Sequence, residues 1–251
     1  MEKITDTSYY LEYIKDNDNI PVGGNALRGG LSSQLSADSD GFRDFFDTVR
    51  ARAEDTVNNP AYMKWVDGNK GLIKTSPELY AHLTSFTQAA GEMYPGISSN
   101  VANRMSFYKE GKPLKLSQAR DNGIFACAEY SMLAQLYLQS AGIKSRFFNG
   151  EVLWDKNHEF SEDHAFIIID DNGEDFIFDP ANPVQTADGP RPSVFQPQVT
   201  DRQMEEFNKK MAKSRRKVGF FEARNMLTGG AAYYGYGDRA NVPPGHVIGK
   251  E

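Results

Sequence analysis

The chain has 251 residues and a mass of 28.1 kDa, which fits one domain or two small ones. Its net charge of −6 disfavours non-specific nucleic-acid binding, because such binding depends on lysine and arginine contacts with phosphates. The one cysteine excludes an intrachain disulfide and a cysteine-based zinc cluster, and no apolar run reaches the ~20 residues of a membrane helix.

Residues 1–38 are rich in aspartate, asparagine, glycine and serine, and we expect a loop-rich arm there. Their polar start lacks the apolar stretch of a secretion signal, which predicts a cytoplasmic protein or one exported without a cleaved signal peptide. Residues 39–115 are expected to form a helical region that contributes to substrate specificity. Its first helix is predicted from apolar residues at helical spacing, namely Phe42, Phe45, Phe46, Val49 and Ala53. A second helix is predicted from start signals at residues 75–78, and its apolar face consists of Leu79, Leu83, Phe86, Ala90 and Met93.

Residues 116–227 are expected to form the core of the protein. Residues 126–141 contain no glycine or proline and are apolar on most faces, which predicts a helix buried inside a domain. Strand-like runs follow at residues 145–154, 165–169 and 176–178, and the turn between the last two predicts a hairpin. After residue 180 the pattern predicts a proline-rich loop, then a helix over residues 201–217, then an irregular tail rich in glycine and tyrosine at residues 228–251. One helix followed by an antiparallel sheet indicates an α+β fold.

Three residues in the predicted core suggest catalysis. Cys127 lies at the start of the buried helix, where the helix dipole and unpaired N–H groups favour the nucleophilic thiolate. His164 opens the strand at residues 165–169 and is the best placed of the 4 histidines to act as a general base. Asp179 ends the next strand, and a tight hairpin brings that end beside the start of the first strand. The sequence therefore predicts a catalytic triad in which Asp179 orients His164.

Each of these residues also has a structural interpretation. A lone buried cysteine is often a small apolar core residue, and an aspartate before Pro180 is typical of a turn that ends a strand. Among the other histidines, we interpret His82 as a packed residue of the second helix. His158 belongs to a polar loop and His246 to a tail rich in proline and glycine.

The order of Cys127, His164 and Asp179 resembles the transglutaminase-like cysteine-enzyme superfamily, whose fold is related to papain. The matching segments are residues 123–133, 141–146, 164–166 and 178–180. The resemblance implies an α+β fold with a transglutaminase-like or papain-like core. In that core the helix carrying the nucleophile packs on an antiparallel sheet, and a helical N-terminal region is added to it.

The chain departs from the family in several places. Phe125 and Ala126 stand where the family often has glycine before the cysteine. The motif of the CoA-dependent arylamine acetyltransferase branch is missing, as are the acidic calcium sites of animal transglutaminases. The zinc-binding cysteines of the N-glycanase branch cannot exist in a chain with one cysteine. We therefore expect no metal and no cofactor.

The resemblance implies that Cys127 attacks an amide carbonyl of a peptide or protein and forms a thioester. Release of the thioester to water describes a protease or deamidase, and release to an amine describes a transglutaminase. The backbone N–H of Cys127 and the side chain of Gln118 are candidate donors of an oxyanion hole. The alternative function is a non-catalytic structural protein that keeps the fold and binds assembly partners through its terminal arms. A basic cluster at residues 209–217 leaves a third interpretation, a contact with nucleic acid.

Overall fold

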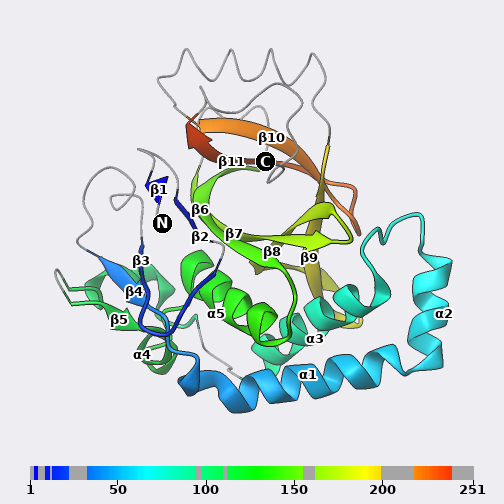
Figure 1. Cartoon of the computed structure of the whole chain (residues 1–251), viewed down its shortest axis with the longest axis horizontal. Coiled ribbons are helices and arrows are strands. Elements are labelled where there is room, and N and C mark those ends of the chain that lie inside the picture. The colour runs from blue at the N-terminus through cyan, green and yellow to red at the C-terminus, as the bar shows by residue number, and fades with distance from the viewer. Residues whose placement is uncertain are drawn as a thin grey trace.

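A ring of long strands lies above a layer of helices in Figure 1. The structure is a computed structural model that describes residues 3–4, 9–11, 13–22, 33–93, 98–109, 112–154, 162–198 and 218–238. The antiparallel strands run in the order β6-β11-β10-β9-β8-β7, and a further pairing of β7 with β6 closes the ring. Their bounds are β6 Ser145–Leu153, β7 Glu162–Asp171, β8 Glu174–Thr186, β9 Gly189–Pro197, β10 Val218–Asn225 and β11 Ala231–Asp238.

Successive side chains of these strands face opposite sides of the barrel wall. The inner faces of all six strands share one apolar cluster of Phe148, Val152, Phe166, Ile168, Ile177, Phe195, Ala223, Ala232 and Tyr234. The outer faces of β6, β7 and β8 belong to a second, larger cluster that includes the helices. An uninterrupted apolar run such as residues 165–169 is explained by this arrangement, because both sides of β7 are buried.

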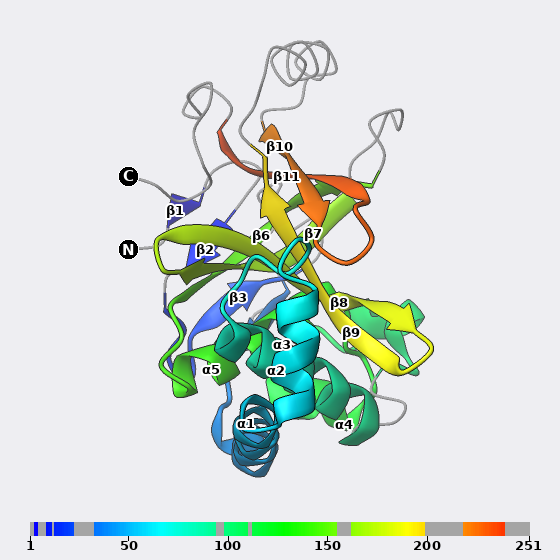
Figure 2. The same cartoon turned by 90° about the vertical axis from the view of Figure 1, so that its right-hand side faces the viewer.

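The helices cover the outside of the barrel (Figure 2). The longer ones are α1 (Arg43–Val57), α2 (Pro60–Gly68), α3 (Pro77–Met93) and α5 (Cys127–Ser140). Short helical turns are η2 (Asp40–Phe42), η3 (Val101–Ser106) and α4 (Leu116–Asp121). The apolar stripe predicted for the first helix is confirmed, since all of its members are buried. Asn59 separates α1 from α2, and its side chain accepts a hydrogen bond from the Ala61 N–H and so caps α2.

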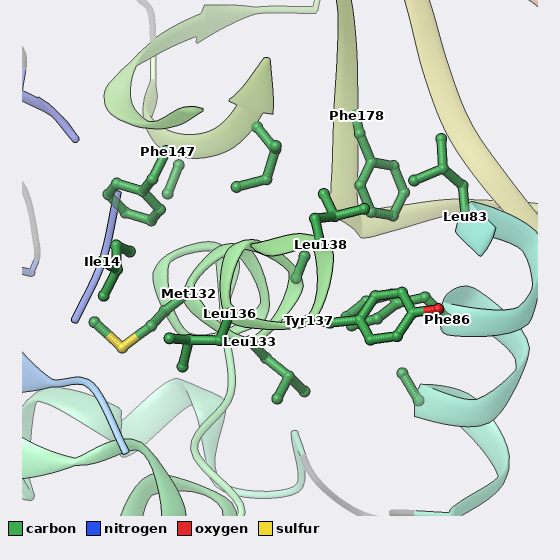
Figure 3. Packing of buried hydrophobic residues seen from close by; sticks show 14 of the residues in the cluster. Ile14, Leu83, Phe86, Met132, Leu133, Leu136, Tyr137, Leu138, Phe147 and Phe178 are labelled. Atoms are coloured by element: carbon green, nitrogen blue, oxygen red, sulfur yellow. The ribbon is translucent and has the colours of Figure 1, made fainter. Parts of the chain in front are cut away.

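α5 is the centre of the larger apolar cluster (Figure 3). It packs on β6, β7 and β8, and its Tyr137 lies beside Phe86 of α3 with ring centroids 5.7 Å apart. Phe86 in turn meets Phe178 of β8 edge-on at 6.0 Å. Rings in such tilted and edge-on contacts stabilise the packing beyond their buried area. The helix that begins at Cys127 is therefore fixed between the barrel wall and the outer helices.

The predicted fold class is wrong. In place of a transglutaminase-like or papain-like core, the chain forms a closed six-stranded antiparallel barrel with a small second sheet and a few helices. The sequence indicates only the strands that become β6, β7 and β8. β9 lies in the segment expected to be a proline-rich loop, and β11 lies in the tail expected to be irregular. With these strands and β10 present, the sheet can close on itself, which removes its exposed edges.

The segment expected to be a loop-rich arm contains short strands. β3 (Asn19–Pro21) pairs with β4 (Gln34–Ser36), which also pairs in parallel with β5 (Leu114–Lys115) to form the small sheet. β1 (Lys3–Ile4) pairs with β2 (Tyr9–Leu11), and β2 pairs with β6. Several predictions lie outside the described residues, namely the helix at residues 201–217, the basic cluster at residues 209–217, His158 and His246. None of the helices in the described ranges combines the length and the apolar character that a bilayer crossing requires.

Candidate active site

Cys127 is the first residue of α5, as the sequence predicts, and it is half-buried. The turn before it contains Gly123, whose φ of 66° lies in the left-handed region that glycine adopts without a steric penalty. The first four N–H groups of a helix have no partner within the helix, so the thiol lies at the positive end of the helix dipole. This position favours a thiolate.

His164 and Asp179 lie together on neighbouring strands. Nε2 of His164 in β7 is 2.8 Å from Oδ2 of Asp179 in β8, and both side chains are almost completely buried. Phe178 pairs with Ile167 in the register of the hairpin, which places Asp179 on the same face as His164. The hairpin turn that sets this register is formed by Asn172 and Gly173, both with positive φ.

The thiol of Cys127 lies close enough to His164 and to the backbone N–H of Ala165 for both groups to stabilise its thiolate. Because Nε2 of His164 faces Asp179, Nδ1 is the ring nitrogen left for the sulfur. Burial raises the pKa of the Cys127 thiol, but the hydrogen bond and charge of His164, the Ala165 N–H and the charge of Arg104 bring it below its ordinary value. Burial lowers the pKa of His164, but Asp179 and Cys127 outweigh this effect and raise it to about 10. Both changes favour a thiolate–imidazolium pair.

Two further residues bind Asp179, and the sequence did not indicate either of them. Nδ2 of Asn182 lies 3.1 Å from Oδ2 of Asp179, and the hydroxyl of Tyr234 donates to the same oxygen at 3.2 Å. Asn182 follows Asp179 in β8, where the register with β9 shifts between Asp179 and Val184. Tyr234 belongs to β11, so its part in the site depends on a strand that was not predicted. These donors fix the position of the carboxylate beside His164.

Aromatic rings surround His164 on the barrel side. Trp154 meets its ring edge-on at 5.5 Å between centroids, and Tyr234 lies 6.4 Å away. Trp154 is 37% exposed, so the site borders solvent on this side. Nε1 of Trp154 also lies 3.3 Å from Oε2 of Glu162, which orients the indole.

The remaining predicted residues lie elsewhere or have other partners. Gln118 of α4 is exposed, and its Oε1 accepts from the backbone N–H of Lys115 at 3.2 Å, so its side chain caps its own helix. Its role in an oxyanion hole stays a prediction. His82 is packed, with Nδ1 2.6 Å from the hydroxyl of Tyr137. No three histidine, cysteine, aspartate or glutamate side chains in the described ranges gather where they would hold a metal ion.

Comparison with known proteins adds no relative. No model of a protein family matches this chain. No curated protein matches it either. The resemblance to transglutaminase-like enzymes therefore stays a prediction from short motifs, and the functional argument depends on the geometry around Cys127.

Proposed function

We propose that the protein is a cysteine-dependent acyl-transfer enzyme that acts on an amide of a peptide or protein. The observation that carries the proposal is the arrangement in which His164 lies between the thiol of Cys127 and Asp179, and contacts the carboxylate at 2.8 Å. A histidine between a thiol and a buried carboxylate can accept a proton from one and be stabilised by the other. The structural alternative, an inert apolar cysteine, does not explain a thiol at a helix start beside a histidine that is paired with a buried carboxylate.

The reaction follows from these positions. Sγ of the Cys127 thiolate attacks the amide carbonyl carbon, and we expect the backbone N–H of Cys127 to bind the oxyanion. The C–N bond breaks as His164 gives its proton to the leaving nitrogen, which departs as an amine and leaves a thioester. Water then attacks the thioester and gives a proton to His164, so the C–S bond breaks, a carboxylic acid departs and the thiolate–imidazolium pair is restored. An amine that attacks in place of water forms a new amide by the same proton transfer.

An activated ester tests this proposal without knowledge of the natural substrate. The protein is mixed with p-nitrophenyl acetate at neutral pH, and the intact mass is followed with time. We expect one acetyl group on the wild-type protein, none on Cys127→Ala, and much slower acetylation of His164→Gln. Methylamine added afterwards measures whether the acyl group passes to an amine faster than to water.

The matched control for the histidine variant is His82→Gln, which replaces a packed histidine outside the site. It should be acetylated at the wild-type rate. Acetylation of the wild-type protein no faster than that of a small free thiol would contradict the proposal. So would equal rates in the wild-type protein and His164→Gln, because the thiol would then react without a base.

A further inference from the structure

The turn that carries Cys127 is held by a distant segment of the chain. We define the nucleophile turn as residues 122–127 and the clamp as residues 98–108, which include η3. The backbone N–H of Asn100 donates to the Gly123 carbonyl at 2.7 Å, and its side chain donates to the Asn122 carbonyl at 2.8 Å. The hydroxyl of Ser98 donates to the Phe125 carbonyl at 2.9 Å. The clamp therefore bonds most of the carbonyl groups that lead to the nucleophile.

The clamp also reaches the turn through a buried carboxylate. Glu129 lies in the first turn of α5 and its side chain is completely buried. Oε2 of Glu129 accepts from the backbone N–H of Ala126 at 2.9 Å, immediately before Cys127. Oε1 accepts from Nη2 of Arg104 at 3.0 Å and from the hydroxyl of Tyr108, both in the clamp. An isolated buried carboxylate is costly, so this one requires its donors in place.

We propose that Arg104 and Glu129 are positioning residues, which fix the peptide before Cys127 and set the charge around its thiol. The inference rests on the proposed function. It assigns to residues 98–108 a part in placing the nucleophile, whereas the sequence suggested only a contribution to substrate specificity. Neither Arg104 nor Glu129 touches the sulfur, since they act through Ala126 and through their charges.

The charges around the thiol come from several elements. His164 of β7 lies beside the sulfur and lowers the pKa of the thiol, and Asp179 acts through His164. Arg104 of η3 contributes a positive charge that favours the thiolate, and burial with the charge of Glu129 raises the pKa of the Tyr108 hydroxyl, which therefore stays neutral. Glu129, which pairs with Arg104, carries the opposite charge, so its effect on the thiol should have the opposite sign. Removal of the charge of Arg104 should therefore raise the pKa of the thiol, and removal of the charge of Glu129 should lower it.

The test measures the rate of alkylation by iodoacetamide across the pH range. Cys127 is the sole cysteine, so the rate reports this thiol alone, and the reagent is neutral, so charge variants do not attract or repel it. We expect the midpoint of the rate profile to rise by ~0.5–1 pH unit in Arg104→Gln and to fall by a similar amount in Glu129→Gln. Arg104→Lys should restore the wild-type midpoint. The acetylation rate with p-nitrophenyl acetate should fall in both glutamine variants, because the turn is less firmly held.

The control is Arg52→Gln, which removes an exposed arginine that pairs with Glu92 and should leave the profile unchanged. A purely structural role would shift both glutamine variants upward, and that result would overturn the proposal. An Arg104→Gln protein whose rate profile has the same midpoint as the wild-type protein would also overturn the proposal. If Arg104→Gln does not fold, the sign of the shift in Glu129→Gln decides. If the wild-type protein is alkylated like a free thiol, both the role of the clamp and the proposed function are wrong. If the midpoint of its rate profile is low, and His164→Gln raises that midpoint but Arg104→Gln and Glu129→Gln leave it unchanged, only the role of the clamp is wrong.

Discussion

The carboxylate of Asp179 offers the sharpest test of the site. Asp179→Asn keeps the shape of the side chain but replaces one acceptor oxygen by an amide N–H₂ group. In the wild-type protein the completely buried carboxylate accepts from His164, Asn182 and Tyr234, and it is the opposite charge that holds the proton on His164. An amide cannot supply that charge, so we expect His164 to lose its proton at a much lower pH than in the wild-type protein.

The size of the effect follows from general magnitudes. Breaking one partner of a buried ion pair costs about 3–5 kcal/mol. One pKa unit corresponds to about 1.4 kcal/mol, so the pKa of His164 should fall by ~2–4 units, from about 10 to ~6–8. At pH ~7.5 the imidazolium should then be largely lost, and the thiol of Cys127 should approach its ordinary pKa of about 8.5, at which about 10% is ionised at that pH. Alkylation by iodoacetamide at pH ~7.5 should therefore slow by a factor on the order of 10.

The assay is the pH profile of alkylation, together with urea unfolding to confirm that the variant folds. Asp175→Asn is the matched control, because Asp175 lies on the same strand and pairs with Arg146 at 2.8 Å. It should lower stability but leave the thiol profile unchanged. Identical profiles for Asp179→Asn and the wild-type protein would refute the reasoning, since the carboxylate would then have no effect on the thiol.

Three further measurements test the surroundings of the site. Tyr234→Phe removes the hydroxyl that donates to Asp179 at 3.2 Å but keeps the ring. We expect the free energy of unfolding in urea to fall by about 1.5–3 kcal/mol, and an unchanged value would exclude this hydrogen bond. Gly150→Ala should lower the melting temperature and slow acetylation, because a Cβ there would lie 2.2 Å from the carbonyl oxygen of Gly235, and a wild-type melting curve would contradict the close approach of β6 and β11. Because the folded-state pKa of His164 is raised from 6.5 to about 10, its stabilisation is complete below pH 6.5 and is lost as the pH rises towards 10. The stability advantage of the wild-type protein over His164→Gln in urea should shrink across that range, and an advantage that grows with pH would reverse the sign of the argument.

The helices and the first three barrel strands could be predicted because their signals are local. Apolar residues at helical spacing define α1 and α3, and a long apolar run without glycine or proline defines α5. The turn at Asn172 and Gly173 defines the hairpin of β7 and β8. Cys127, His164 and Asp179 were brought together by these same elements. Local patterns therefore sufficed for the three residues that carry the proposed chemistry.

The other half of the barrel could not be predicted because its strands depend on contacts distant in sequence. β9 contains prolines, which usually exclude a strand, but Pro190 and Pro197 lie near its ends and Pro192 lies where the register with β8 shifts. Tyrosine and glycine alternate in β11, a pattern that is typical of irregular structure. In the barrel Gly235 of β11 lies directly against Gly150 of β6, where there is no room for a Cβ. Tyr234 was missed for this reason, since it joins the site only in the closed ring. Asn182 was missed although it follows Asp179 by three residues on β8, because that segment was expected to be a loop.

Closure of the ring by β11 also sets the order in which the surroundings of Asp179 are completed. Cys127, His164 and Asp179 all lie on α5, β7 and β8, whereas Tyr234 lies on β11. Tyr234 can therefore donate to Asp179 only after β11 has paired with β6. A chain cut before β11 should hold this carboxylate less firmly, because it lacks the hydroxyl of Tyr234.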